Sequence, residues 1–246
     1  MSLMIYLVRH GQTEYNLNGR IQGWCDSPLT AEGRHQAEET GRRLQGVPFA
    51  AAFASTSPRA ADTARMILSH AGQAAVTLSL LDELREYCFG SFEGGQIDTL
   101  YRRLAQEQGY ASPEEWVQAY RHADYQMLAE AVAESDPEQL AENEARFLSR
   151  LHQGLFKVLA ASPAHGNILV VSHGMAITAL LKEIRRDALL YRSVPNGSVT
   201  RLAYNVFGGL QIVDIADCSA THFDPHDIVG SDPTQTAKTL ARRRSF

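Results

Sequence analysis

The amino-acid sequence predicts an α/β fold with a mostly parallel sheet, and the first strand is its clearest element. An apolar run at 3–8, rich in β-forming residues, ends abruptly in Arg9-His10-Gly11. Such a run is typical of a strand buried on both faces, as in the core of a parallel sheet. Comparable apolar runs recur at 49–54, 75–81 and 167–172. Two alternating runs, at 198–206 and 210–215, are joined by Phe207-Gly208-Gly209. This predicted hairpin makes one edge strand antiparallel.

Helices are predicted between these strands. Thr30 is a suitable N-cap for a helix from Ala31 to about Gln45. Ser57-Pro58 supplies an N-cap and a proline at the first helical position, for a helix that extends to about His70. A shorter helix, from about Met175 to Glu183, follows the fourth strand. Alternating strands and helices are what a parallel sheet needs, because its strands are joined by crossover connections.

The stretch from about 96 to 162 has a different composition, rich in Ala, Glu, Gln and Arg and without β-branched runs. Ser112-Pro113-Glu114-Glu115 combines a capping box with a proline at the first helical position. Asp136-Pro137-Glu138-Gln139 offers a second start of the same kind. We expect two or three helices here, the last one long and returning to the sheet. The early part, about 96–135, is predicted to be a helical lid inserted over the carboxyl edge of a single domain spanning 1–246.

Composition and charge exclude several classes of partner. The chain has 246 residues, enough for one sizeable α/β domain, and its net charge of −5 offers no basic field for nucleic acid. Its three cysteines share no metal-ligand spacing, which favours a reducing compartment without disulfides or zinc. No apolar run approaches the ~20 residues of a membrane span, and no secretory signal is recognisable. We therefore expect a cytoplasmic protein that needs no metal or cofactor.

The sequence signals fade beyond about Ser219. We interpret the tail that ends in Arg242-Arg243-Arg244 as surface. His222 and His226, with Asp224 between them, could suggest a metal ion. The segment around them lacks the ordered flanking elements of a metal site, so a structural role or exposure to solvent is favoured.

Unusual polar residues follow the ends of the predicted strands. They are Arg9 and His10 after the first strand, Arg59 after the second, Glu86 after the third and His173 after the fourth. If the strands are parallel, these side chains converge on one edge of the sheet, where open α/β sheets bind ligands. Two cationic side chains, two imidazoles and one acid suit phosphoryl transfer without a metal ion. The two helices that begin at this edge also favour an anion there. The alternative is that each strand simply ends in polar residues.

Four sequence blocks occur in order between residue 5 and about residue 180. They are LVRHGQT at 7–13 with Asn16, QGW at 22–24 and DSPLT at 26–30; STSPRA at 55–60 with Thr63-Ala64; LRE at 84–86 with Gly90 and FEG at 92–94; and VSHG at 171–174. Together they resemble the signature of the histidine phosphatase superfamily, and more narrowly its phosphoglycerate-mutase-like branch. The resemblance implies a doubly wound sheet with helices on both faces.

The resemblance also implies a role for each catalytic residue. His10 is the nucleophile that becomes phosphohistidine, and Arg9, Arg59 and His173 neutralise the phosphoryl oxygens. Glu86 acts as the general acid and base. Glu83 is kept as a reserve for that role, because several acids lie nearby in the sequence.

Five further residues are predicted to bind substrate. Asn16 adds a hydrogen bond to the phosphoryl group, and Thr13 and Gln22 are contacts of second rank. Gly11 and Gly174 allow the backbone to approach the ligand closely. Asn16 as a mere turn residue is the alternative at that position.

The resemblance leaves mutase and phosphatase to be distinguished. Where mutases of this branch keep tyrosine, lysine and paired arginines, this chain has Phe89, Ile97 and Val117-Gln118. We therefore favour hydrolysis of a small phosphomonoester over phosphoglycerate mutation, although Arg102, Arg103 or Arg121 could replace the missing cations. An inactive relative that only binds phosphorylated ligands is a third hypothesis. Tyr101, Arg102, Tyr120 and Arg121 are expected to set substrate choice. The sequence identifies neither the substrate nor the oligomeric state.

Overall fold

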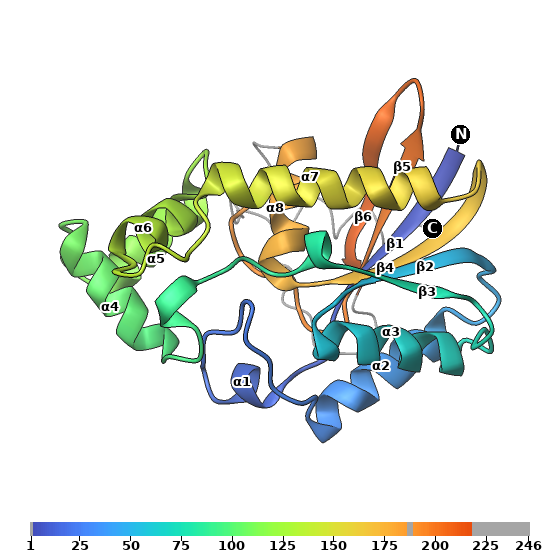
Figure 1. Ribbon diagram of the computed structural model, residues 1–246, viewed down its shortest axis with the longest axis horizontal. Helices are drawn as coiled ribbons and strands as arrows, with labels where there is room; N and C mark the ends of the chain where they lie inside the picture. Colours follow the sequence, from blue (N-terminus) through green and yellow to red (C-terminus); the bar gives the residue numbers. More distant parts are fainter. Residues whose placement is uncertain (1, 186–188, 218–246) are drawn as a thin grey trace, which may run out of the picture.

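The computed structural model describes residues 2–185 and 189–217, and it shows an α/β sandwich around one sheet (Figure 1). Six strands of the described residues form that sheet in the order β3-β2-β4-β1-β5-β6. They are β1 (Ser2–Arg9), β2 (Phe49–Ser55), β3 (Leu78–Leu81), β4 (His165–Ser172), β5 (Val199–Asn205) and β6 (Gly209–Asp217). The predicted tail, with His222, Asp224, His226 and Arg242–Arg244, lies outside the described residues.

The strand directions confirm the predicted mostly parallel sheet. β1 pairs in parallel with β4, β4 with β2, and β2 with β3. β5 runs antiparallel to both β1 and β6, so the predicted hairpin forms an antiparallel edge. The third strand is shorter than expected, because only 78–81 of the predicted 75–81 pairs with β2.

Helices cover both faces of the sheet, as a doubly wound fold requires. One face carries α2 (Ala31–Arg43) and α3 (Pro58–His70), and the other carries α7 (Glu144–Ala161) and α8 (Gly174–Ile184) (Figure 1). The alternation of β1 explains this arrangement, since successive side chains of a strand point to opposite faces. Leu3, Ile5 and Leu7 pack with residues of α7 and α8, whereas Val8 packs with residues of α3.

Most predicted helix starts are present in the structure. The Thr30 hydroxyl accepts the N–H of Gly33 at 2.9 Å and caps α2. Pro58 begins α3, although the Ser57 side chain makes no cap bond. The Ser112 side chain caps the helix that begins at Pro113 by accepting the N–H of Glu115 at 3.2 Å.

The predicted helix start at Asp136 is wrong. Asp136 follows the last residue of a helix, and its carboxylate accepts the N–H groups of Leu140 and Ala141, each at 2.8 Å. This side chain closes a turn because an aspartate bonds readily to nearby backbone amides outside helices. The long returning helix, α7, begins eight residues later, where Asn143 is the N-cap.

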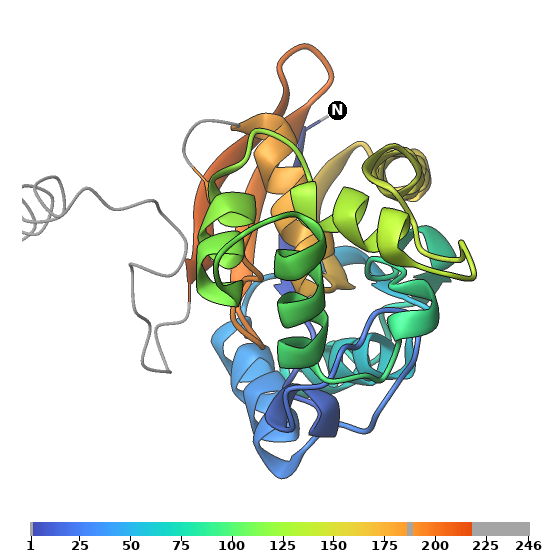
Figure 2. The same cartoon turned by 90° about the vertical axis from the view of Figure 1, so that its left-hand side faces the viewer.

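Three helices of the insertion stand in front of the carboxyl ends of the parallel strands (Figure 2). They are α4 (Ile97–Glu107), α5 (Pro113–His122) and α6 (Met127–Ser135). Their core includes Leu104, Trp116 and Val132, and it continues into Phe147 of α7 and Ala179 of α8. The insertion is therefore packed on the helices that flank the site. A short helix, α1 (Glu14–Leu17), and two 3-10 turns, Asp82–Leu84 and Gly90–Phe92, complete this end of the molecule.

Candidate active site

The five predicted catalytic residues meet at the carboxyl edge of the sheet. Arg9 ends β1 and His10 follows it; Arg59 lies in the first turn of α3, Glu86 follows the 82–84 turn, and His173 connects β4 to α8. Four of them are buried, with exposed fractions of 3% for His10, 1% for Arg59, 6% for Glu86 and 0% for His173. Parallel strands bring their carboxyl ends to one edge, and there they form an enclosed, charged centre.

The His10 ring presents an unprotonated nitrogen to this centre. Its Nδ1 lies 2.8 Å from the carbonyl oxygen of Gly11, which can only accept, so Nδ1 carries the proton. Nε2 keeps its lone pair and accepts a 3.3 Å hydrogen bond from Nε–H of Arg59. Burial and the charges of Arg59 and Arg9 hold the pKa of His10 well below its usual value. An uncharged imidazole beside a cation is suited to attack an electrophile.

His173 faces the same space as His10. The two ring centroids are 5.1 Å apart, with an angle of 64° between the ring planes. Within the described part of the chain, neither ring nitrogen of His173 has a hydrogen-bond partner. Burial, followed by the charge of Arg59, lowers its pKa well below the usual value. An unpaired buried polar group costs about 1–3 kcal/mol, which a bound ligand can recover. The ring is therefore placed to bind a group between the two imidazoles.

The guanidinium of Arg59 makes more hydrogen bonds to the protein itself than its predicted role as a phosphate ligand implied. Its Nη1 donates to the carboxylate of Asp26 at 2.7 Å and to the carbonyl of Cys25 at 2.9 Å. Its Nη2 donates to the carbonyl of Gly23 at 2.8 Å. The guanidinium thus fastens the 22–26 loop to the centre, while its Nε–H faces His10.

Arg9 supplies a second cation, and its side chain is partly buried. Its Nη1 donates to the carbonyl of Val194 at 2.5 Å, which connects the end of β1 to the segment before β5. Its buried Nε has no hydrogen-bond partner among the described residues. Burial lowers its pKa to about 10, so the guanidinium stays charged at neutral pH.

The carboxylate of Glu86 lies at the N-terminal end of α8. It accepts the N–H groups of Met175 at 2.9 Å and Ala176 at 3.0 Å, and also that of Tyr87 at 2.9 Å. The sequence suggested that the amides at the start of α8 would attract an anion, and the structure shows that two of them bind the protein's own carboxylate. Burial raises the pKa of Glu86, and the hydrogen bonds from Tyr87 and Met175 limit the rise. A carboxyl group with a raised pKa can hold a proton for donation. Glu83, the reserve, instead pairs with Lys157 at 2.6 Å near the surface.

Three of the predicted substrate-binding residues bind each other in this structure. The Thr13 hydroxyl donates to Oε1 of Gln22 at 2.5 Å and accepts the N–H of Asn16 at 3.2 Å. The amide oxygen of Asn16 accepts the N–H of Thr13 at 3.2 Å. This network closes the capping box of α1 and shapes the loop beside His10.

The two predicted substrate-binding glycines are required by packing. A Cβ on Gly11 would lie 2.2 Å from the carbonyl oxygen of Gly33 in α2. A Cβ on Gly174 would lie 2.6 Å from Cβ of Ser193 and 3.3 Å from Cζ of Arg9. Gly11 therefore lets two backbone segments approach each other, and Gly174 makes room for the side chain of Ser193.

Three further residues, for which no role was predicted, hold the site together. Asn196 donates from Nδ2 to the carbonyl of His10 at 3.0 Å and to Oδ1 of Asn16 at 3.1 Å. The Glu93 carboxylate accepts consecutive amide N–H groups of the 23–25 loop. Arg150 donates to the backbone carbonyls of Glu83, Arg85 and Glu86. The FEG block at 92–94 pointed to Glu93, whereas no local pattern distinguished Asn196 or Arg150 from surface residues.

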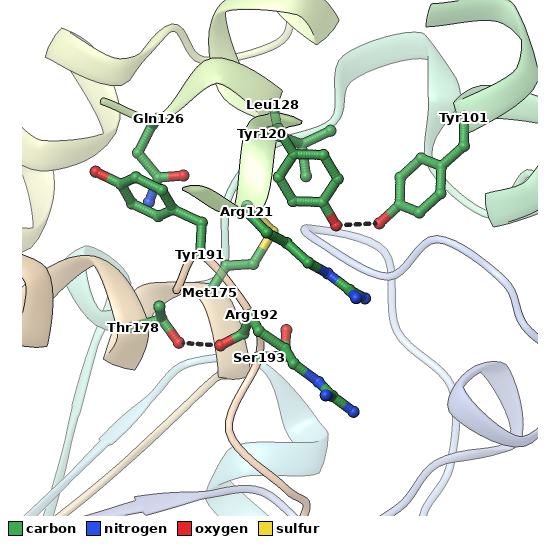
Figure 3. A pocket seen from close by; sticks show the side chains of 10 residues that line it. All are labelled: Tyr101, Tyr120, Arg121, Gln126, Leu128, Met175, Thr178, Tyr191, Arg192 and Ser193. Atoms are coloured by element: carbon green, nitrogen blue, oxygen red, sulfur yellow. Dashed lines mark hydrogen bonds between the residues drawn. The ribbon is translucent and has the colours of Figure 1, made fainter. Parts of the chain in front are cut away.

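A cavity of about 220 Å³ adjoins the centre (Figure 3). It is lined by Tyr101, Tyr120 and Arg121 of the insertion, as expected, together with residues of α8 and of the segment before β5. Arg102 lines a second depression, which shares Tyr101 and Arg121 with this cavity. Arg103 pairs with Glu107 at 2.7 Å on the surface.

Two further observations concern metals and membranes. In residues 2–185 and 189–217, no group of three or more His, Cys, Asp or Glu side chains is arranged to hold a metal ion. None of the helices in these ranges has the length and apolar character needed to cross a bilayer.

Comparison with known proteins gives one consistent result. A curated relative from Gloeobacter violaceus, named 2,3-bisphosphoglycerate-dependent phosphoglycerate mutase 2, is 35% identical over 188 residues, which is 75% of this chain and 76% of the relative. The crystal structure of a phosphoglycerate mutase from Bacillus anthracis is 32% identical with a TM-score of 0.80, and the match covers 89% of this chain and 94% of that one.

A second solved structure shares the fold. It is described as a putative alpha-ribazole-5'-P phosphatase from Escherichia coli, and it is 24% identical with a TM-score of 0.65. The match covers 90% of this chain and 99% of that one. The model of the histidine phosphatase superfamily, branch 1, matches residues 5–217. The chain therefore belongs to branch 1 of the histidine phosphatase superfamily.

Proposed function

We propose that this protein is a metal-independent phosphomonoester hydrolase that acts on a small phosphorylated substrate through a phosphohistidine at His10. The observation that carries the proposal is the state of the His10 ring, whose Nδ1 proton is held by Gly11 and whose Nε2 lone pair faces the buried centre. Family membership supports phosphoryl transfer in general. The cysteine content supports the cytoplasm as the compartment.

The first step is attack by Nε2 of His10 on phosphorus. A new N–P bond forms as the bond between phosphorus and the ester oxygen breaks. When the Nε2 lone pair turns to phosphorus, its hydrogen bond from the Nε–H of Arg59 breaks, and this N–H stabilises charge on the phosphoryl oxygens together with Arg9 and His173. This arrangement suits a transition state in which most of the catalysis is positioning and electrostatic stabilisation.

Glu86 serves both steps as the proton carrier. In the first step it donates a proton to the leaving alkoxide, which is a poor leaving group without one. In the second step its carboxylate accepts a proton from the water that attacks the phosphohistidine, which releases phosphate and restores His10. Burial supports the first role because it raises the pKa of Glu86.

The test is turnover and covalent labelling with p-nitrophenyl phosphate. Wild-type protein is expected to release phosphate and to carry acid-labile phosphate after rapid quenching. His10→Ala should abolish both signals, whereas the exposed His35→Ala should leave them intact. If His10→Ala turned over substrate at the wild-type rate, the nucleophile assignment would be refuted. A complete absence of labelling in the wild-type protein would favour the binding-only alternative. EDTA should have no effect on turnover, and strict metal dependence would contradict the proposal.

A phosphoglycerate mutase is the second candidate, and one specific observation favours it. Arg121 and Arg192 both line the cavity beside the centre, where they could hold a second anion. Against this, Phe89, Ile97 and Val117 pack into or against the apolar core of the insertion. Mutase activity would appear as isomerisation of phosphoglycerate that depends on a bisphosphate primer. Phosphate release without a primer identifies the hydrolase.

A further inference from the structure

Two residues that line the cavity also lie next to the site of the proposed chemistry. Met175, one of its lining residues, donates its N–H to Glu86, and Ser193, another, lies against the backbone of Gly174. A hydrogen bond of 3.0 Å from the N–H of Tyr191 to the carbonyl of Arg121 ties the insertion to the segment before β5. An alcohol leaving from phosphorus beside Glu86 would therefore extend into this cavity.

The two ends of the cavity differ in chemistry. The guanidinium groups of Arg121 and Arg192 extend in the same direction at one end (Figure 3). Gln126 lies at the other end, beside the ring of Tyr191 (Figure 3). Between these ends the lining includes the ring of Tyr120 and the apolar side chains of Leu128 and Met175.

Gln126 has an unusual environment for an amide side chain. Its exposed fraction is 1%, and neither its Oε1 nor its Nε2 has a hydrogen-bond partner within the described residues. It is the N-cap residue of α6, yet its side chain makes no cap bond. The local structure uses only its backbone, because its N–H donates to Glu144 at 2.8 Å and its carbonyl accepts from Glu130.

An unpaired buried amide is costly, and such groups are rare in folded proteins. Nothing in the packing of α6 explains a glutamine here, because the backbone bonds would form with any side chain. A leucine or methionine would fill the same space without the unpaired polar atoms. A bound group that offers a donor next to an acceptor would satisfy both ends of the amide.

We propose that Gln126 is a specificity-determining residue whose amide forms hydrogen bonds with an uncharged donor and a neighbouring acceptor on the leaving group of the substrate. This inference rests on the proposed hydrolase function and names the substrate class of that site. The leaving group is small, since about 220 Å³ lies below the range of pockets for drug-sized ligands. Its far end carries either two neighbouring hydroxyls or an amide. A phosphorylated protein segment does not fit this description.

The experiment compares two pairs of phosphomonoesters with wild-type protein. Glycerol 1-phosphate is paired with propyl phosphate, and 3-carbamoylphenyl phosphate is paired with phenyl phosphate. Sites built to bind a polar substrate group discriminate strongly against analogues that lack it. We expect kcat/KM to favour the polar member of at least one pair by about 10-fold or more. The pair that shows the preference identifies the group as a diol or an amide.

Gln126→Met then tests the residue, because methionine keeps the length of the side chain and removes both polar ends. We expect the preference within the pair to fall to about 3-fold or less, with kcat/KM for the apolar member unchanged within that range. The melting temperature should not fall, which distinguishes a specificity role from a structural one. Gln118→Met, an exposed substitution on α5, is the matched control and should retain the preference.

Three outcomes would overturn the inference. The first is equal hydrolysis of both members of each pair by wild-type protein, a result that needs no variant. Gln126→Met could also lower kcat/KM equally for both members, or leave the preference intact. Hydrolysis of none of the four esters, together with no labelling of His10, would instead refute the proposed function and this inference with it.

Discussion

Arg150 provides the sharpest test of how the site is held together. From α7, its Nη1 donates to the carbonyls of Glu83 at 3.1 Å and Arg85 at 2.9 Å, and its Nη2 donates to the carbonyl of Glu86 at 3.0 Å. The same guanidinium binds the carboxylate of Glu142 through Nε at 2.7 Å and Nη2 at 2.6 Å. One side chain therefore fixes the backbone that places the Glu86 carboxylate at α8.

Arg150→Lys keeps the charge but removes this geometry. A single ammonium nitrogen cannot reach three carbonyls and both oxygens of a carboxylate, so two or three hydrogen bonds are lost. At about 1 kcal/mol each, we expect the free energy of unfolding to fall by about 2–3 kcal/mol. For a protein of this size the melting temperature should drop by about 5–10 °C. Arg146→Lys, one turn earlier and exposed, is the control and should change neither quantity.

Activity provides the second measurement for Arg150→Lys. An alkyl phosphate needs a proton from Glu86 to release its alkoxide, whereas p-nitrophenolate leaves without one. Since general acid catalysis contributes about 10²–10⁴-fold, a displaced Glu86 should lower kcat/KM for the alkyl ester by at least about tenfold. The effect on p-nitrophenyl phosphate should be much smaller. Equal losses with both esters, or unchanged stability, would refute the positioning role of Arg150.

The remaining predictions concern packing and pH. Gly33→Ala should destabilise the fold by about 1–3 kcal/mol in urea unfolding, because the new Cβ would lie 1.9 Å from the carbonyl oxygen of Gln12. A gain of about 1 kcal/mol, the ordinary effect of alanine in a helix, would contradict this contact. The pKa values of His10 and His173 are lowered on folding, so the unfolded chain binds more protons than the folded chain below about pH 6.5. The free energy of unfolding therefore decreases as the pH is lowered through this range, by about 1.4 kcal/mol per pH unit for each imidazole. Replacing His173 with glutamine should reduce that slope between pH 6.5 and 5.5, whereas the exposed His35→Gln serves as the control; an unchanged slope would show that His173 does not contribute.

The pH profile of kcat/KM follows from the protonation states of His10 and Glu86. His10 must be unprotonated to attack, and its lowered pKa places the acidic limb well below pH 6.5. Glu86 must be protonated to donate, so activity declines as the pH rises through its raised pKa. A bell-shaped profile is expected with alkyl phosphates, and the basic limb should weaken with p-nitrophenyl phosphate. Identical profiles for the two esters would argue against Glu86 as the acid.

Local patterns in the sequence determined the framework of this protein. Apolar runs that end in polar residues identified the strands, and the caps at Thr30 and Ser112 placed two helices correctly. These features depend on neighbouring residues alone, because burial periodicity and capping are short-range effects. The same reasoning failed at Asp136, where a side chain that caps helices elsewhere closed a turn instead.

Only the tertiary structure decided which hydrogen bonds hold the residues of the site in place. Glu86 sits on the amides of Met175 and Ala176, Arg59 fastens the 22–26 loop, and Arg150 holds the turn before Glu86. Each of these contacts joins segments far apart in the chain, so no sequence window contains both partners. The unpaired amide of Gln126 is equally invisible in the sequence, because burial and the lack of a partner are properties of the packed molecule.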